Sequence, residues 1–178
     1  ATATVQLTIP PPPPLPAITA EGITNAASFR GSVAEGGVAP GELVTIFGTN
    51  MGPAAAQTLQ LDARGFVTTR LGGTRVLFDG TPGPMVVTSA GQVSAIVPYG
   101  LEDAKTVSVI VEFEGRQSPA VTMPVAAAAP AIFTQNSSGS GAGSVIRQTG
   151  ELITASSPAA AGEVLTLFGT GEGATTPA

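Results

Sequence analysis

The chain opens with strict alternation of apolar and polar side chains. Within residues 1–9, Ala3, Val5, Leu7 and Ile9 fall on one side of an extended backbone, while threonine and glutamine side chains fall on the other. A period of two residues predicts a β-strand with one buried face. No hairpin partner lies nearby in the sequence, so two interpretations stay open. The segment is either an edge strand or frayed terminus of its own domain, or a donor strand that pairs with another subunit.

A proline-rich spacer over residues 10–16 follows this strand. Prolines occupy six of its seven positions. Such a run adopts a stiff polyproline helix that extends by about 3.1 Å per residue. We therefore expect the spacer to hold the first strand away from the domain behind it.

Between residues 17 and 126, short apolar runs alternate with turn-forming residues. The predicted strands are a short first strand near residues 18–23, then residues 43–47, 74–78, 85–88, 93–97, 106–112 and 120–125. Residues 53–65 are rich in alanine and poorly patterned, which predicts a loop with one helical turn. Turns about every ten residues are typical of an all-β protein, and this region is predicted to be an antiparallel, immunoglobulin-like β-sandwich.

A sequence repeat links this sandwich to the remainder of the chain. Residues 41–52 (GELVTIFGTNMG) return as residues 162–173 (GEVLTLFGTGEG), with seven of twelve positions identical. A repeat of this kind indicates a duplicated structural unit. Residues 127–178 offer only four short strands, near residues 131–134, 144–147 and 152–154 and in the second copy of the repeat. They are therefore predicted to form a second, incomplete β lobe that is deficient in strands.

Composition narrows the possible functions. The 178 residues include no cysteine and no histidine, so disulfides, thiolate metal sites and the usual general base of hydrolases are excluded. Only 11% of residues are charged, the net charge is −5, and Lys105 is the single lysine, which argues against a nucleic acid partner. No apolar run is long enough to span a membrane. We expect no enzymatic activity, no cofactor and no metal site.

Three weaker candidates for chemistry are present. Glu102 with Asp103, or Glu112 with Glu114, could contribute calcium ligands, but the spacing is not that of a calcium loop, and the second pair is expected to be solvated. Residues 169–173 (GTGEG) resemble a phosphate-binding loop but lack the lysine and helix that such loops need, so a turn is expected. Lys105 is a candidate for an isopeptide bond with an asparagine, which the sequence favours only weakly.

The sequence also resembles known families. Residues 40–52 resemble the opening strand and turn of IPT/TIG immunoglobulin-like domains. Over residues 22–173 the chain is more similar to an uncharacterised family of secreted, Solibacter-type bacterial C-terminal modules, and the matching stretches are residues 23–29, 76–84, 89–99 and 129–134. This resemblance implies two immunoglobulin-like lobes, an extracellular location and no enzymatic activity. It also predicts a further half-domain after the second repeat, which this sequence does not contain.

Two functions follow as expectations. In the first, the protein is an extracellular structural subunit of a filament or surface assembly, in which the strand of Ala3, Val5, Leu7 and Ile9 completes the deficient lobe of the next subunit in a head-to-tail homopolymer. In the alternative, the chain is a passive adhesion, carbohydrate-binding or spacer module of a larger secreted protein. Its partners would then be other cell-surface proteins or glycans.

Overall fold

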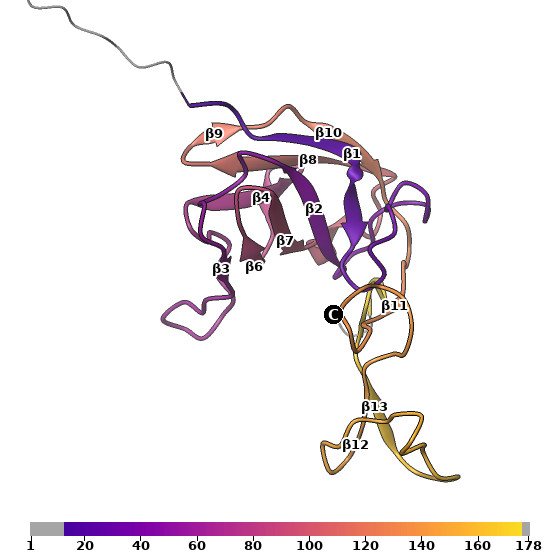
Figure 1. Cartoon of the computed structure of the whole chain (residues 1–178). Helices are drawn as coiled ribbons and strands as arrows, with labels where there is room; N and C mark the ends of the chain where they lie inside the picture. Colours follow the sequence, from indigo (N-terminus) through magenta and orange to yellow (C-terminus); the bar gives the residue numbers. More distant parts are fainter. Residues whose placement is uncertain (1–12, 176–178) are drawn as a thin grey trace, which may run out of the picture.

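The computed structural model describes residues 13–175, which form β-strands joined by turns and loops (Figure 1). Residues 17–125 build a β-sandwich-like body of two antiparallel sheets. The first sheet has the spatial order β1 (Ala17–Asn25), β2 (Leu43–Thr49), β7 (Gln92–Ile96), β6 (Met85–Thr88) and β3 (Gln57–Thr58). The second has the order β10 (Val121–Pro124), β8 (Thr106–Phe113), β4 (Thr74–Phe78) and β5 (Thr81–Pro82), with β9 (Arg116–Gln117) also paired to β8. The prediction of an all-β, antiparallel fold is confirmed.

Alternation along the strands determines which side chains fill the space between the sheets. Val107, Val109 and Val111 point inward from β8 and are buried, as the sequence pattern predicts. Phe78 is the largest fully buried side chain of the described residues. All three methionines, Met51, Met85 and Met123, are fully buried as well. Their unbranched side chains fill irregular gaps that β-branched residues leave.

Two local predictions were wrong. The helical turn expected in residues 53–65 is absent, because this stretch contains β3, which pairs with the edge of β6. The only helical element in the described residues is a short 3₁₀ turn, Tyr99–Leu101. Residues 152–154 do not form a strand; Leu152 makes an isolated bridge with Ile146. Strand β3 pairs with residues about thirty positions away along the chain, so this tertiary contact rather than local propensity decided its backbone conformation.

The predicted solvation of Glu112 was also wrong. Its side chain is 5% exposed and forms ion pairs with Arg75 at 2.8 Å and Arg70 at 3.0 Å. The hydrogen bond from Arg75 is the main reason that the pKa of Glu112 falls to about 2; burial opposes it, and hydrogen bonds from Gln117 and Arg70 add to it. Glu114 lies beyond the end of β8, in a turn with a φ of 50°. The two carboxylates therefore do not share a strand face.

None of the helical structure described for residues 13–175 is long and apolar enough to cross a membrane.

Candidate assembly site

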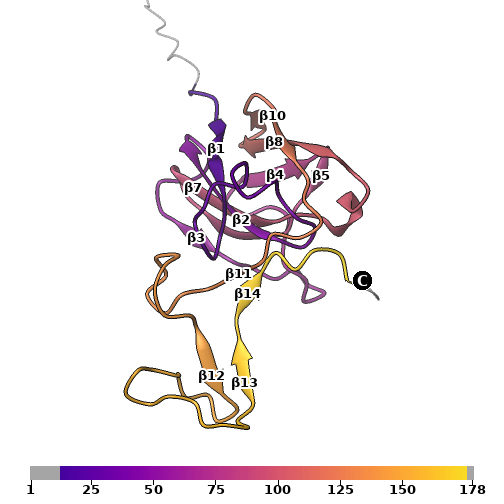
Figure 2. The same cartoon turned by 90° about the vertical axis from the view of Figure 1, so that its right-hand side faces the viewer.

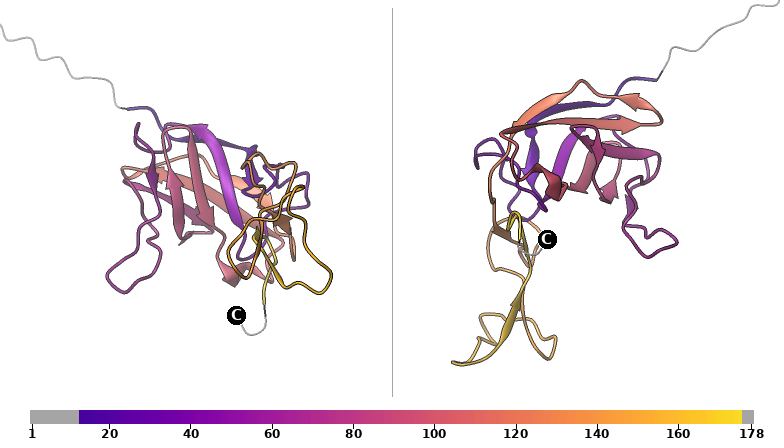
Figure 3. Two further views of the ribbon diagram at one scale, coloured as in Figure 1. Left: turned by 60° about the horizontal axis from the view of Figure 1, so that its bottom comes forward. Right: turned by 180° about the vertical axis from the view of Figure 1, so that it is seen from behind.

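Beyond the sandwich, residues 127–175 form a narrow projection, which we call the C-terminal half-lobe. Its strands are β11 (Ala131–Ile132), β12 (Val145–Arg147), β13 (Leu165–Leu167) and β14 (Gly169–Thr170). They pair as two separate two-stranded sheets, β11 with β14 and β12 with β13. Figure 2 shows β11 and β14 next to the sandwich and β12 and β13 further out, and Figure 3 shows the same projection from two other sides.

The half-lobe repeats the pairing of β1 with β2. In the sandwich, β1 pairs with β2 in two runs separated by a register shift, Ala17↔Thr49 with Ile18↔Gly48, and then residues 23–25 with residues 44–46. In the half-lobe, β11 pairs Ala131↔Thr170 and Ile132↔Gly169, and β12 pairs residues 145–147 with residues 165–167. Adding 121 to the numbers of β2 gives those of β13 and β14. The half-lobe is thus a second copy of the β1–β2 unit, with a longer insertion, residues 133–144, at the register shift.

The turn before each repeat strand has the same geometry. Gly41 and Gly162 have φ values of 74° and 82°, in the left-handed region that favours glycine. The carboxylate of Glu42 accepts a hydrogen bond from the Ala39 amide at 2.7 Å, and that of Glu163 accepts one from the Ala160 amide at 2.9 Å. The repeated Gly-Glu pair therefore encodes one kind of turn, in which the glutamate caps the backbone three residues earlier.

The second oxygen of each glutamate binds the neighbouring strand. In the sandwich, Glu42 Oε1 accepts a hydrogen bond from Asn25 Nδ2 at 2.9 Å. In the half-lobe, the ladder position of Asn25 is occupied by Arg147, whose Nε lies 2.7 Å from Glu163 Oε1. In the sandwich the neutral amide of Asn25 donates to the fully buried carboxyl of Glu42. In the half-lobe the charged guanidinium of Arg147 donates to the partly exposed carboxyl of Glu163. This substitution suits a copy of the unit that has less protein around it.

What differs between the two copies is the far side of the repeat strand. In the sandwich, β2 lies between β1 and β7. In the half-lobe, β13 has β12 on one side, and no other strand of residues 13–175 pairs with it. The amide of Phe168 donates to Ser144 on the β12 side. Because alternate residues of an antiparallel strand use the same edge, the backbone groups of Leu165 and Leu167 point to the open edge.

The open edge is accompanied by exposed apolar side chains. Ile46 is 0% exposed in the sandwich core, whereas Leu167, at the same position of the repeat, is 56% exposed. Val164, Phe168 and Ile132 are exposed by 61, 47 and 47%. An apolar strand with an unused hydrogen-bonding edge is a template for pairing with a further strand.

The half-lobe is attached to one end of the sandwich by specific bonds. Asn25 Nδ2 donates to the carbonyl of Ala129 at 2.9 Å, and the amide of Leu43 donates to Thr170 Oγ1 at 2.7 Å. The amide of Ala129 in turn donates to the carbonyl of Gly171 at 2.8 Å. Strands β11 and β14 are therefore held against the ends of β1 and β2, and β13 projects beyond them.

Gly171 is needed for this attachment. Its φ is 82°, and a Cβ there would overlap the carbonyl oxygen of Ala129. We expect Gly171→Ala to release residues 127–175, so that limited proteolysis cuts them rapidly while the sandwich persists. Gly150→Ala is the matched control, because Gly150 has a φ of 87° but a Cβ at that position would meet no described atom within 4 Å. Equal protease resistance of both variants would contradict this role of Gly171.

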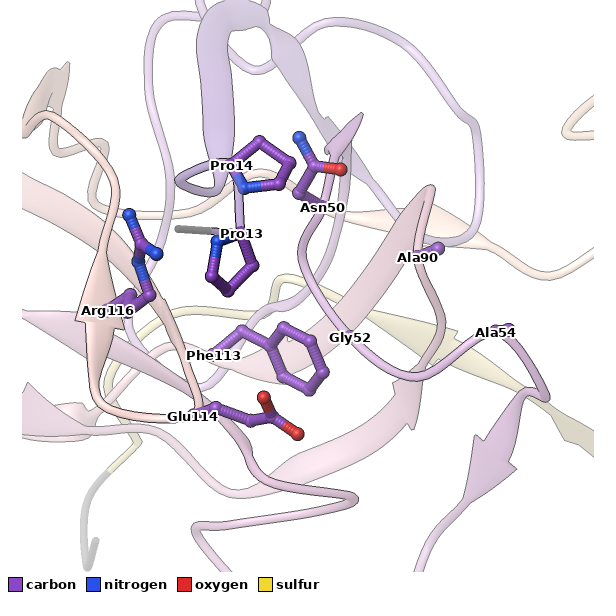
Figure 4. A pocket seen from close by; sticks show the side chains of 9 residues that line it. All are labelled: Pro13, Pro14, Asn50, Gly52, Ala54, Ala90, Phe113, Glu114 and Arg116. Carbon is purple, nitrogen blue, oxygen red and sulfur yellow. The ribbon is translucent and has the colours of Figure 1, made fainter. Parts of the chain in front are cut away.

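The opposite end of the sandwich receives the N-terminal segment. Pro13 and Pro14 lie there in a pocket, shown in Figure 4, together with Asn50, Phe113, Glu114 and Arg116. Asn50 Nδ2 donates to the carbonyl of Leu15 at 3.3 Å. The predicted donor residues Ala3, Val5, Leu7 and Ile9 lie outside the described residues.

The other candidate groups are not brought together into a site. Lys105 is exposed, whereas the amide of Asn25 is buried and bonded to Glu42 and Ala129. Within residues 13–175, no three acidic side chains gather in a way that could hold a metal ion. Of residues 169–173, Gly169 and Thr170 form β14 and pair with β11, so the segment is not an open loop. The sequence repeat predicted the strand and turn of the half-lobe. The exposed tip of the loop between β3 and β4 was not predicted, because residues 53–65 show no periodic pattern.

Comparison with known proteins found no match to this chain among protein-family models, curated protein sequences or solved structures.

Proposed function

We propose that this protein is an extracellular structural subunit that assembles head to tail by strand exchange. The observation that carries the proposal is the half-lobe: it repeats the β1–β2 unit but leaves the edge of β13 open and Leu167 exposed. A strand added at this edge would satisfy the backbone groups of Leu165 and Leu167 by β-augmentation. With β12 and β13 it would make three strands, the smallest number that is commonly stable.

The donor in this proposal is the alternating segment of residues 1–9. It supplies the apolar side chains of Val5, Leu7 and Ile9. Burial of each of these side chains contributes about 1.5–3 kcal/mol to the free energy of association. The translational, rotational and conformational entropy lost on association opposes this contribution. Low charge and the resemblance to the secreted, Solibacter-type modules support an extracellular location. Polymer formation in this scheme needs neither a cofactor nor catalysis.

The positions of the two ends favour exchange between subunits over pairing within one chain. Pro13 lies at one end of the sandwich and the half-lobe is attached at the other. Strand β1 runs between these ends, and its terminal residues pair with Thr49 and Val44 of β2, so it spans five residue steps, roughly 16–17 Å. Strand β13 lies further out, beyond the attached end. From Ile9 to Pro13 the chain reaches at most about 14 Å. A donor strand therefore cannot lie along β13 of its own subunit, and the contact propagates from one subunit to the next.

Removal of residues 1–9 tests the proposal. We expect the full chain to form oligomers that lengthen with concentration, measured by light scattering and electron microscopy, and the shortened chain to be monomeric. Leu7→Asp should have the same effect because it places a charge on the apolar side of the donor. Thr2→Asp, on the polar side and near the terminus, is the control and should leave assembly intact.

Oligomers that persist without residues 1–9 would contradict strand exchange through this segment. A full chain that stays monomeric at every concentration would contradict the proposal as a whole and favour the second function.

The second candidate function is an adhesion or spacer module of a larger secreted protein. It is favoured by the loop between β3 and β4, which is closed by the bridge between Leu61 and Val67 and projects from the sandwich (Figures 1 and 3). Asp62 Oδ1 accepts hydrogen bonds from the amides of Arg64 and Phe66, which shapes the tip and leaves Phe66 65% exposed. The Arg64 guanidinium lies 5.6 Å from the centre of the Phe66 ring. Loss of surface or glycan binding in Phe66→Ala, with assembly unchanged, would support this function.

A further inference from the structure

The sandwich shows which strand belongs on the open edge. There, β7 covers the second edge of β2 with the register Ile46↔Val93 and Val44↔Ala95. Val93, Ala95 and Val97 are all 0% exposed, and the amide of Val97 donates to the carbonyl of Glu42 at 2.9 Å. Pro98 then ends the pairing. A strand that takes this place on the half-lobe needs the same three features: alternate apolar side chains, a free amide on the last of these residues, and a following proline that ends the pairing.

The N-terminal segment has this pattern. Residues 92–98 read QVSAIVP and residues 4–10 read TVQLTIP. Aligned at the proline, Val5, Leu7 and Ile9 take the buried positions of Val93, Ala95 and Val97. The two residues between them, Gln6 and Thr8, are polar; their counterparts in β7 are Ser94 and Ile96. The amide of Ile9 takes the place of the Val97 amide.

Resting on the strand exchange proposed above, we propose that residues 4–10 of one subunit replace β7 on the half-lobe of the next. The strand runs antiparallel to β13, with Val5 opposite Leu167 and Leu7 opposite Leu165. Ile9 donates its amide hydrogen to the carbonyl of Glu163, the counterpart of Glu42. Gln6 lies opposite Thr166, where the sandwich has Ser94 Oγ and Thr45 Oγ1 at 3.0 Å.

The proline run sets this register. If the donor moved so that Leu7 faced Leu167, Pro11 would take the position of Val97 and would have no amide hydrogen for Glu163. If it moved the other way, Ala3 would face Leu167, and a methyl group would replace the larger side chain of Val5. Only the proposed register places three large apolar side chains inward and keeps every amide that the ladder uses.

One contact at the end of the strand fits the same placement. In the sandwich, a Cβ on Gly41 would lie 2.6 Å from atoms of the Tyr99 ring, so this ring covers the glycine. At Gly162 no described atom lies within 4 Å of the corresponding point. Pro11 aligns with Tyr99, and its ring is the donor group that would cover Gly162.

Engineered cysteines test the register, because the chain contains no cysteine of its own. One preparation carries Gln6→Cys and the other Thr166→Cys, and the two are mixed under mild oxidation. Ser94 and Thr45 alternate with residues whose backbone groups bond across the ladder, so the Gln6–Thr166 pair is of the non-hydrogen-bonded type, with Cα atoms about 4.5 Å apart. A disulfide is allowed at that separation.

We expect a covalent dimer from this pair and at least tenfold less from the matched controls, Thr4→Cys or Thr8→Cys mixed with Thr166→Cys. In the proposed register these diagonal Cα atoms are about 7–8 Å apart, beyond the usual disulfide range. If only a control pair gives a covalent dimer, and assembly still requires residues 1–9, the proposed register is wrong but strand exchange is still supported. No dimer from any pair, together with assembly that ignores residues 1–9, would overturn both.

Discussion

Replacing Ile46 with alanine should lower the free energy of unfolding of the sandwich by about 3–4 kcal/mol. Ile46 is fully buried, pairs with Ile23 and Val93 on the two neighbouring strands, and belongs to the central core cluster. The substitution removes three buried carbon atoms and leaves a cavity that a close-packed interior cannot collapse to fill. Urea denaturation, followed by circular dichroism or fluorescence of Tyr99, measures the change.

Leu167→Ala is the matched variant, since Leu167 holds the same position in the repeat. In the chain that lacks residues 1–9 it should cost less than about 0.5 kcal/mol, because the side chain is already 56% exposed. In the full chain the same substitution should weaken assembly about tenfold or more. Equal losses of stability for Ile46→Ala and Leu167→Ala in the shortened chain would mean that Leu167 is buried in solution, which contradicts an open half-lobe.

The stability of the sandwich should also depend on pH through Glu42, by up to about 3 kcal/mol. Burial raises the pKa of this carboxyl from 4.5 to about 7; hydrogen bonds from the Ala39 amide and from Asn25 lower it only in part, and Glu35 adds a small increase. The folded state therefore binds the proton more tightly than the unfolded state. The resulting stabilisation is complete below pH 4.5 and is lost as the pH rises through 7.

Glu112 acts in the opposite direction and in a lower window. Its folded pKa of about 2 lies below its ordinary value of 4.5, so its contribution is present above pH 4.5 and is lost as the pH falls towards 2. Because Arg70 and Arg75 are partly exposed, solvent screens the ion pairs, and a contribution of about 1–2 kcal/mol is expected. Together the two carboxyls place the greatest stability near pH 4.5.

Denaturation midpoints measured between pH 2 and pH 8 on glutamine variants separate the two effects. Glu42→Gln should remove the fall in stability between about pH 4.5 and pH 7. The glutamine amide faces two donors, Asn25 and the Ala39 amide, so this variant is less stable than the wild type at every pH. Glu112→Gln should remove the fall at low pH instead. A Glu42→Gln variant whose stability follows the wild-type pH dependence in parallel would contradict this role of Glu42.

Local patterns in the sequence predicted much of the fold. The alternation of Val107, Val109 and Val111 predicted a half-buried strand, and the apolar residues 43–47 predicted β2, because side-chain direction in a strand depends only on the spacing of residues. The prediction for residues 53–65 was wrong because it depended on a distant contact. Strand β3 is only two residues long and is formed by pairing with the edge of β6. The pairing of Glu112 with two arginines also joins residues far apart in the sequence, which no local pattern reveals.

The candidate site divides in the same way. By itself, the sequence determined that residues 41–52 and 162–173 encode one strand and turn, and that residues 1–9 form an alternating segment without a local partner, since both are properties of nearest neighbours along the chain. Only the tertiary structure decided that the second copy pairs as the first does and that Arg147 replaces Asn25 beside the repeated glutamate. It also decided that, among the strands of residues 13–175, β13 pairs with β12 alone. These three features depend on which strands meet in space. Ile46 is buried because two sheets pack around the first copy of the repeat, whereas Leu167 is exposed because no second sheet of the described residues covers the second copy.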